Sequence, residues 1–169
     1  MTIPSTKKVS LDDLDTFGKT RKSVSSSHGN IELRVTRAGQ PEEVLKTQWL
    51  NFYIDSWRSV IEAFFGEDTG ANRVPAVSLT ATLALEQKSY EIKSPFDGDW
   101  EVAAIYGEGR PNGGIGGDAF GNGLLKVQSV TFNDGKQHIK ASFKFSYLDR
   151  DGYVVKVESD EFWAENDGV

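Results

Sequence analysis

The chain has 169 residues, a length typical of one domain, and its formal net charge at pH 7 is -6. It contains no cysteine, which excludes disulfides, zinc–cysteine sites, iron–sulfur clusters and thiol catalysis. The acidic balance disfavours nucleic acid and anionic membranes as partners, because proteins bind both mainly through lysine and arginine.

Residues 1–28 are polar and include the runs TKK, KTRKS and SVSSSH, a composition typical of a flexible arm. This segment lacks the apolar core of a signal peptide. No apolar run in the sequence approaches the roughly 18 residues that a transmembrane helix needs. We therefore expect a flexible polar arm at 1–28, a single domain at 29–169, and the cytoplasm as the default location.

The stretch from Pro41 to Phe65 predicts one long helix. Pro41 suits a first helical turn, Glu42 and Glu43 favour the positive end of the helix dipole, and Gly66 suits the stop. The apolar residues recur at spacings of three and four, as on one face of a helix. They are Leu45, Trp49, Phe52, Tyr53, Trp57, Val60, Ile61 and Phe64.

Alternation of apolar and polar residues predicts strands in the rest of the chain. The segments that alternate are 31–36, 77–85, 88–94, 100–106, 124–132, 139–147 and 153–163. The Asp-Gly pairs at 134–135 and 151–152 are strong signals for hairpin turns. The C-terminal half is therefore expected to be an antiparallel meander of about six strands.

Together these elements predict an α+β fold. One long amphipathic helix would pack on a twisted antiparallel meander of six to seven strands, shaped like a half-sandwich or a cone. The order of a helix followed by a C-terminal meander resembles the cone-shaped NTF2-like fold, which implies a pocket between helix and sheet. That resemblance concerns the fold alone and assigns no activity.

The stretch GGIGGDAFG at 113–121 matches the calcium-binding nonapeptide G-G-x-G-x-D-x-U-x. Such nonapeptides bind calcium between successive turns of a parallel β-helix, so they work in tandem copies. This chain has one copy, and its neighbours alternate as antiparallel strands do. We interpret residues 107–123 as a long loop that presents four residues to a partner: Arg110, Asn112, Asp118 and Phe120.

Few residues suit catalysis or metal binding. His28 and His138 are the only histidines, one in the predicted arm and one on the polar face of a predicted strand. Neither position suits the buried, oriented histidine of a catalytic triad. Asp99 and Glu101 share a strand face but are more typical of a solvated surface. We predict no catalytic residue, no metal site and no cofactor.

Three functional classes follow. The leading one is a non-enzymatic interaction or assembly protein that binds a protein partner or itself through the arm and the glycine-rich loop. The second is a carrier of a small apolar ligand, or an NTF2-like cone-pocket enzyme with Asp99 or Glu101 as acid or base. Its pocket would be lined by Trp100, Tyr106, Phe143 and Tyr147. The third is a calcium-dependent surface module that uses Asp118.

Overall fold

The computed structural model describes residues 9–10, 27–66, 72–110 and 113–167 of the chain. Within these residues it contains twelve strands and no helix. The strands are β1 (Val9–Ser10), β2 (Ser27–Arg37), β3 (Glu43–Thr47), β4 (Leu50–Ile54), β5 (Ser59–Phe64), β6 (Val74–Ala81), β7 (Ser89–Ile92), β8 (Val102–Arg110), β9 (Gly114–Gly117), β10 (Asn122–Asn133), β11 (Lys136–Leu148) and β12 (Val154–Asn166).

The prediction of an α+β fold with a long helix is wrong. Residues 41–65 contain β3, β4 and β5 instead, and β4 and β5 form an antiparallel hairpin closed by a hydrogen bond from the Asp55 amide to the Arg58 carbonyl. All six residues of β5 are buried, so its apolar residues do not alternate with polar ones. A strand that is buried on both faces cannot be distinguished from a buried helix by periodicity. Without the helix, the NTF2-like cone is also wrong.

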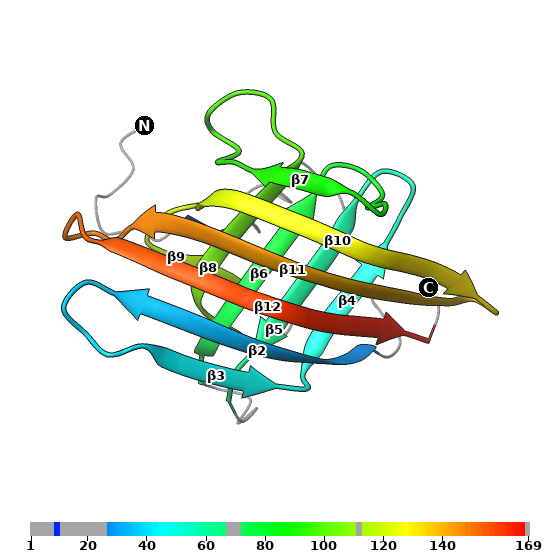
Figure 1. The fold of residues 1–169 in the computed structure, drawn as a ribbon, viewed down its shortest axis with the longest axis horizontal. Coiled ribbons are helices and arrows are strands. Elements are labelled where there is room, and N and C mark those ends of the chain that lie inside the picture. Colours follow the sequence, from blue (N-terminus) through cyan, green and yellow to red (C-terminus); the bar gives the residue numbers. More distant parts are fainter. Residues whose placement is uncertain (1–8, 11–26, 67–71, 111–112, 168–169) are drawn as a thin grey trace.

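The sheet is barrel-like and nearly closed, and its strand order is β3-β2-β12-β11-β10-β7-β8-β6-β5-β4. Figure 1 shows that it folds over into two layers whose strands cross at a large angle. We call β3, β2, β12, β11 and β10 the front layer, and β4, β5, β6 and β8 the rear layer. Strand β7 joins them, because it pairs with β10 on one side and touches β8 through a single parallel pair on the other.

The main core lies between the two layers and is built from the inward-facing residues of both. Its largest fully buried side chains include Phe52 and Ile61 of the rear layer and Leu33 and Phe162 of the front layer. A second, smaller apolar cluster lies on the outer face of the rear layer and contains Phe64, Ala76, Ala103, Ile105, Ile115 and Phe120. The rear layer therefore has apolar clusters on both faces.

Side chains, rather than a ladder of backbone hydrogen bonds, join β4 to the front layer. Gln137 of β11 accepts a hydrogen bond from the Ile54 amide at 2.8 Å and donates one to the Ile54 carbonyl at 2.6 Å. Asn166 of β12 donates to the Phe52 carbonyl at 3.0 Å, and Ser27 contacts the same carbonyl and the Phe52 amide at 3.2 Å. These amide and hydroxyl groups satisfy the backbone of β4 at the edge where the sheet closes.

Several predicted strands are confirmed at residue level. The last three strands form a true antiparallel meander, with the Asp134–Gly135 and Gly152 turns at positive φ as hairpins require. The meander does not extend over the whole C-terminal half, because β6 pairs with β8 and β7 pairs with β10. The number of strands also exceeds the six to seven expected.

The predicted N-terminal arm falls largely outside the described residues, so its flexibility stays a prediction. Val9 and Ser10 form β1, which pairs with Gly116 and Gly117 of β9. Ser27 and His28, placed in the arm by the sequence, are the first residues of β2. The described part of the chain contains no helix long and apolar enough to cross a membrane.

Candidate functional site at the mouth of the sheet

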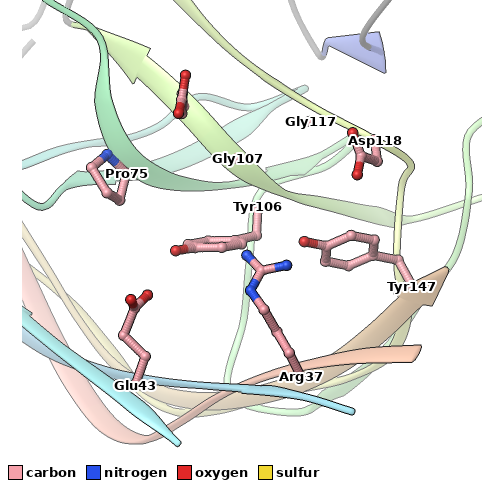
Figure 2. Close-up of a pocket in the computed structure, with 9 residues that line it drawn as sticks. Arg37, Glu43, Pro75, Tyr106, Gly107, Gly117, Asp118 and Tyr147 are labelled. Carbon is pink, nitrogen blue, oxygen red and sulfur yellow. The ribbon is translucent and has the colours of Figure 1, made fainter. Parts of the chain in front are cut away.

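A polar cavity, here called the mouth pocket, lies at one end of the barrel-like sheet, where the two layers meet (Figure 2). Its volume is about 270 Å³, just below the roughly 300–1,000 Å³ of typical ligand pockets. The front layer, the rear layer and the glycine-rich segment all contribute to its wall. The lining residues are Arg37, Glu43, Pro75, Tyr106, Gly107, Glu108, Gly117, Asp118 and Tyr147.

Arg37 occupies the centre of this pocket. It is the last residue of β2, and Figure 2 shows its guanidinium group between the phenol rings of Tyr106 from β8 and Tyr147 from β11. The positive charge of Arg37 acts on both phenols and opposes the rise of their pKa values, so Arg37 couples the two layers electrostatically at the mouth.

Both tyrosines stay protonated at neutral pH. Burial raises the pKa of Tyr106 from 10.0 to about 12, and the negative charge of Glu43 adds to the rise while Arg37 opposes it. Burial also raises the pKa of Tyr147, and again the charge of Arg37 opposes the rise. The pocket therefore presents two neutral phenols that can donate hydrogen bonds.

Three carboxylates share the wall with Arg37. Glu43 is the first residue of β3, and in Figure 2 its carboxylate points toward the phenol of Tyr106. Asp118 is paired with Arg150, whose Nε lies 3.5 Å from Asp118 Oδ1 and whose backbone amide donates to Oδ2 at 3.3 Å. Glu108 is exposed, and its backbone carbonyl accepts a hydrogen bond from Arg73 at 2.6 Å.

The glycine-rich segment forms one wall of the pocket because β9 approaches β8 very closely. A Cβ at Gly107 would collide with the carbonyl oxygen of Gly116, and a Cβ at Gly117 would collide with that of Tyr106. Only glycine permits such an approach. All four residues of β9 are buried. The pairing of β8 with β9 therefore explains why Gly117 of the GGIGGDAFG stretch is a glycine.

The four residues predicted to bind a partner do not lie together. Arg110 ends β8 and is exposed, whereas Asp118 is half-buried in the mouth pocket. Phe120 is only 6% exposed, and its ring centroid lies 5.6 Å from that of Phe96. Asn112 lies outside the described residues. Their role in binding a partner stays a prediction.

Of the four residues predicted to line a pocket, the structure brings two together. Tyr106 and Tyr147 face each other across Arg37 in the mouth pocket. Trp100 packs against the smaller apolar cluster on the rear layer, and Phe143 belongs to the main core. Phe143 also borders a second hollow of about 180 Å³, which Lys126, Lys144, Glu158 and other residues of the front layer line.

Sequence reasoning missed Arg37 and Glu43. Arg37 directly follows the alternating segment 31–36. Its position as a charged residue at the end of a predicted strand was the signal that could have identified it. Glu43 was assigned to a helix terminus, and that error hid its position beside β2. In the structure, Glu43 pairs with Val35, two residues before Arg37, which brings both charged residues to the same end of the front layer.

Comparisons of the chain with protein-family models, with curated proteins and with solved structures give no match. The case for function therefore depends on the mouth pocket itself. Within the described residues, no group of three or more histidine, aspartate or glutamate side chains is placed to hold a metal ion.

Proposed function

We propose that the protein binds a small polar organic molecule in the mouth pocket. The observation that carries this proposal is the Tyr106–Arg37–Tyr147 cluster, two buried phenols around a half-buried guanidinium, which lines a cavity of about 270 Å³. Ligand sites are typically concave and contain a few polar groups that fix the orientation of the ligand. Here those groups come from both layers of the sheet.

The chemistry of the wall favours a polar ligand over the apolar one that the sequence suggested. Arg37 supplies N–H donors, the two phenols supply O–H donors, and the carboxylates supply acceptors. An apolar molecule would leave these groups without partners and would lose their interactions with water. The apolar interior between the layers is filled with side chains such as Phe52 and Leu33, which are fully buried.

Thermal unfolding in the presence of small polar molecules tests this proposal. A ligand that binds only the native state stabilises it by roughly 2.7 kcal/mol at one hundred times its Kd, which raises the Tm by several degrees. We expect such a rise for at least one molecule in a library of amino acids, amines, short acids and polyols. A library that never moves the Tm contradicts the proposal.

Two arginines of β2 provide a matched pair of variants. Arg37→Gln should reduce the affinity for the stabilising molecule at least tenfold, because a charge-assisted hydrogen bond contributes about 1.5–3 kcal/mol. Arg34 lies on the same strand but pairs with Glu158 and Asp160 on the outside of the front layer. Arg34→Gln should therefore leave the affinity unchanged.

A second candidate function, self-assembly, is favoured by the β11–β12 hairpin. Leu148 and Val154 lie opposite each other across this hairpin and are 58% and 47% exposed, and Tyr153 beside them is 61% exposed. Apolar residues that gather on a surface are typical of contact sites. Arg150 of the same turn pairs with Asp118, one of the residues predicted to bind a partner.

Sedimentation equilibrium tests this second function. The wild-type protein should self-associate at high concentration, and Leu148→Ser with Val154→Ser should weaken the association. Phe132→Ser is the control, since Phe132 is 61% exposed but lies on the β10–β11 hairpin. A wild-type protein that remains monomeric contradicts self-assembly.

A further inference from the structure

The charges in the mouth pocket are arranged as two opposite poles. Arg37 ends β2 and Glu43 begins β3, and the turn between them contains Gly39 at a φ of 72° and a hydrogen bond from the Gln40 amide to the Arg37 carbonyl. Figure 2 shows both side chains rising from the front layer into the cavity. One wall of the pocket thus carries a guanidinium and a carboxylate side by side.

Asp118 is already paired with a cation outside the cavity lining, because the side chain and the backbone amide of Arg150 both contact it. Glu108 is exposed, and Arg73 donates to its backbone carbonyl rather than to its carboxylate. Arg37 and Glu43 are the charged pair that rises into the cavity from the front layer (Figure 2).

Figure 2 shows how the two charges lie relative to the tyrosines. The carboxylate of Glu43 points toward the phenol of Tyr106 and adds to the rise of its pKa. The guanidinium of Arg37 lies between the two rings and opposes the rise of the pKa of both phenols. The negative pole is accordingly at Glu43 beside Tyr106, and the positive pole is at Arg37, on the side toward Tyr147.

We propose that the mouth pocket selects a small zwitterion, with its ammonium group at Glu43 and Tyr106 and its carboxylate group at Arg37 and Tyr147. This inference rests on the proposed function, since it names the class of ligand for the same pocket. A zwitterion pairs with both poles, whereas a molecule with one charge pairs with one pole and leaves the other unpaired. A cavity of about 270 Å³ accommodates a molecule the size of a free amino acid.

A set of probes with matched size tests the proposal: β-alanine carries both charges, propylamine only the positive one, and propionate only the negative one. Glycine and 4-aminobutyrate vary the separation of the two charges. Dissociation constants are measured by NMR titration of the full-length protein. At least one of the three zwitterions should bind ten or more times tighter than both propylamine and propionate, because each charged contact typically changes affinity by at least that factor.

Two variants test whether Glu43 forms the negative pole and Arg37 the positive pole. Glu43→Gln should remove most of the preference for the zwitterion over propionate, and Arg37→Gln most of its preference over propylamine. Glu42→Gln is the matched control, since Glu42 neighbours Glu43 but does not line the pocket, and it should change neither ratio.

Two results would overturn the zwitterion, and they are distinguishable. If propionate or propylamine binds as tightly as every zwitterion, the pocket binds small polar molecules but does not select both charges. If no probe binds and no molecule of the wider library raises the Tm, the proposed function fails together with this inference.

Discussion

The front and rear layers of the sheet differ in how their outer faces meet solvent. In β12 of the front layer, buried and exposed residues alternate along most of the strand, so one face is in the core and the other in water. In β5 of the rear layer all six residues are buried, including the charged Glu62, which is 4% exposed. Strands of one sheet can therefore have entirely different patterns of apolar and polar residues, depending on whether one or both of their faces are buried.

The mouth pocket lies where these two kinds of layer meet. Arg37, Glu43 and Tyr147 come from the front layer, and Tyr106 comes from the rear layer. The phenol of Tyr106 owes its raised pKa first to burial, and it lies beside the charges that the front layer supplies. The pocket thus combines the buried environment of one layer with the charged edge of the other.

The largest expected effect comes from comparing one phenylalanine of the rear layer with one of the front layer. Phe64 lies on the outer face of the rear layer and is 1% exposed, whereas Phe132 of the front layer is 61% exposed. Phe64→Ala should reduce the free energy of unfolding by about 3–5 kcal/mol, as for a residue of an ordinary core. Phe132→Ala should change it by no more than about 0.5 kcal/mol. Urea unfolding measures both, and equal effects would remove the distinction between the layers.

The next effect concerns the burial of Tyr106 at high pH. The folded state holds this proton more tightly than the unfolded chain, so stability should fall as pH rises from about 10 to about 12. The loss should reach at most about 2–3 kcal/mol, since one pKa unit corresponds to about 1.4 kcal/mol. Urea unfolding at pH about 9 and about 12 measures it.

Two variants isolate the contribution of Tyr106 from those of other groups that titrate above pH about 10. Tyr106→Phe should lose part of the difference in stability between the two pH values. Tyr153→Phe should keep the whole difference, because Tyr153 is 61% exposed. If Tyr106→Phe behaves like Tyr153→Phe, the phenol of Tyr106 does not titrate as the structure requires.

A smaller effect is expected where side chains join the layers. Gln137→Ala leaves the amide and carbonyl of Ile54 without the two hydrogen bonds that close the sheet. The expected loss is about 1–3 kcal/mol of unfolding free energy, the typical result of leaving a buried polar group unpaired. Gln87 lies in an exposed turn, and Gln87→Ala is the control. Equal stability of the two variants would mean that the hydrogen bonds of Gln137 do not help to hold β4 against the front layer.

The smallest effect belongs to the outer face of the front layer. Lys140 and Glu161 form an ion pair of 2.9 Å there, and their side chains are 44% and 56% exposed. Solvent screens such a pair, so Glu161→Gln should change stability by less than about 1 kcal/mol. A loss as large as that expected for Gln137→Ala would show that this face is less solvated than the structure indicates.

Sequence patterns predicted β2, β10, β11 and β12 of the front layer well because each has a largely buried and a largely solvated face, whereas β3 was assigned to the helix. The alternation from Ile139 to Tyr147 and the Asp134–Gly135 turn both appear as expected. The same patterns failed for β4 and β5, because strands buried on both faces have no alternation for a local reading to detect. Residues 41–65 form three short strands with connections between them, and their apolar residues fall at the spacings of three and four that are typical of a helix.

The candidate site was predictable only in part for the same reason. Tyr106 and Tyr147 lie on strands that the sequence identified, and they were chosen as pocket residues. Arg37 and Glu43 meet them through the pairing of β2 with β3 and through the closure of the sheet, which are contacts between distant parts of the chain. Asp118 was predicted to bind a partner, or calcium in the third functional class; in the structure its carboxylate is paired with Arg150, and both roles stay predictions.

The central claim is that a small polar molecule binds in the mouth pocket, beside Tyr106 and Tyr147. Ring-labelled tyrosine NMR tests it most directly, because the chain has only five tyrosines and two of them line the mouth pocket. Addition of the molecule that most raises the Tm should shift the ring signals of Tyr106 and Tyr147 and leave those of Tyr53, Tyr90 and Tyr153 in place. Shifts confined to the other three tyrosines, or none at all at saturation, would contradict the account.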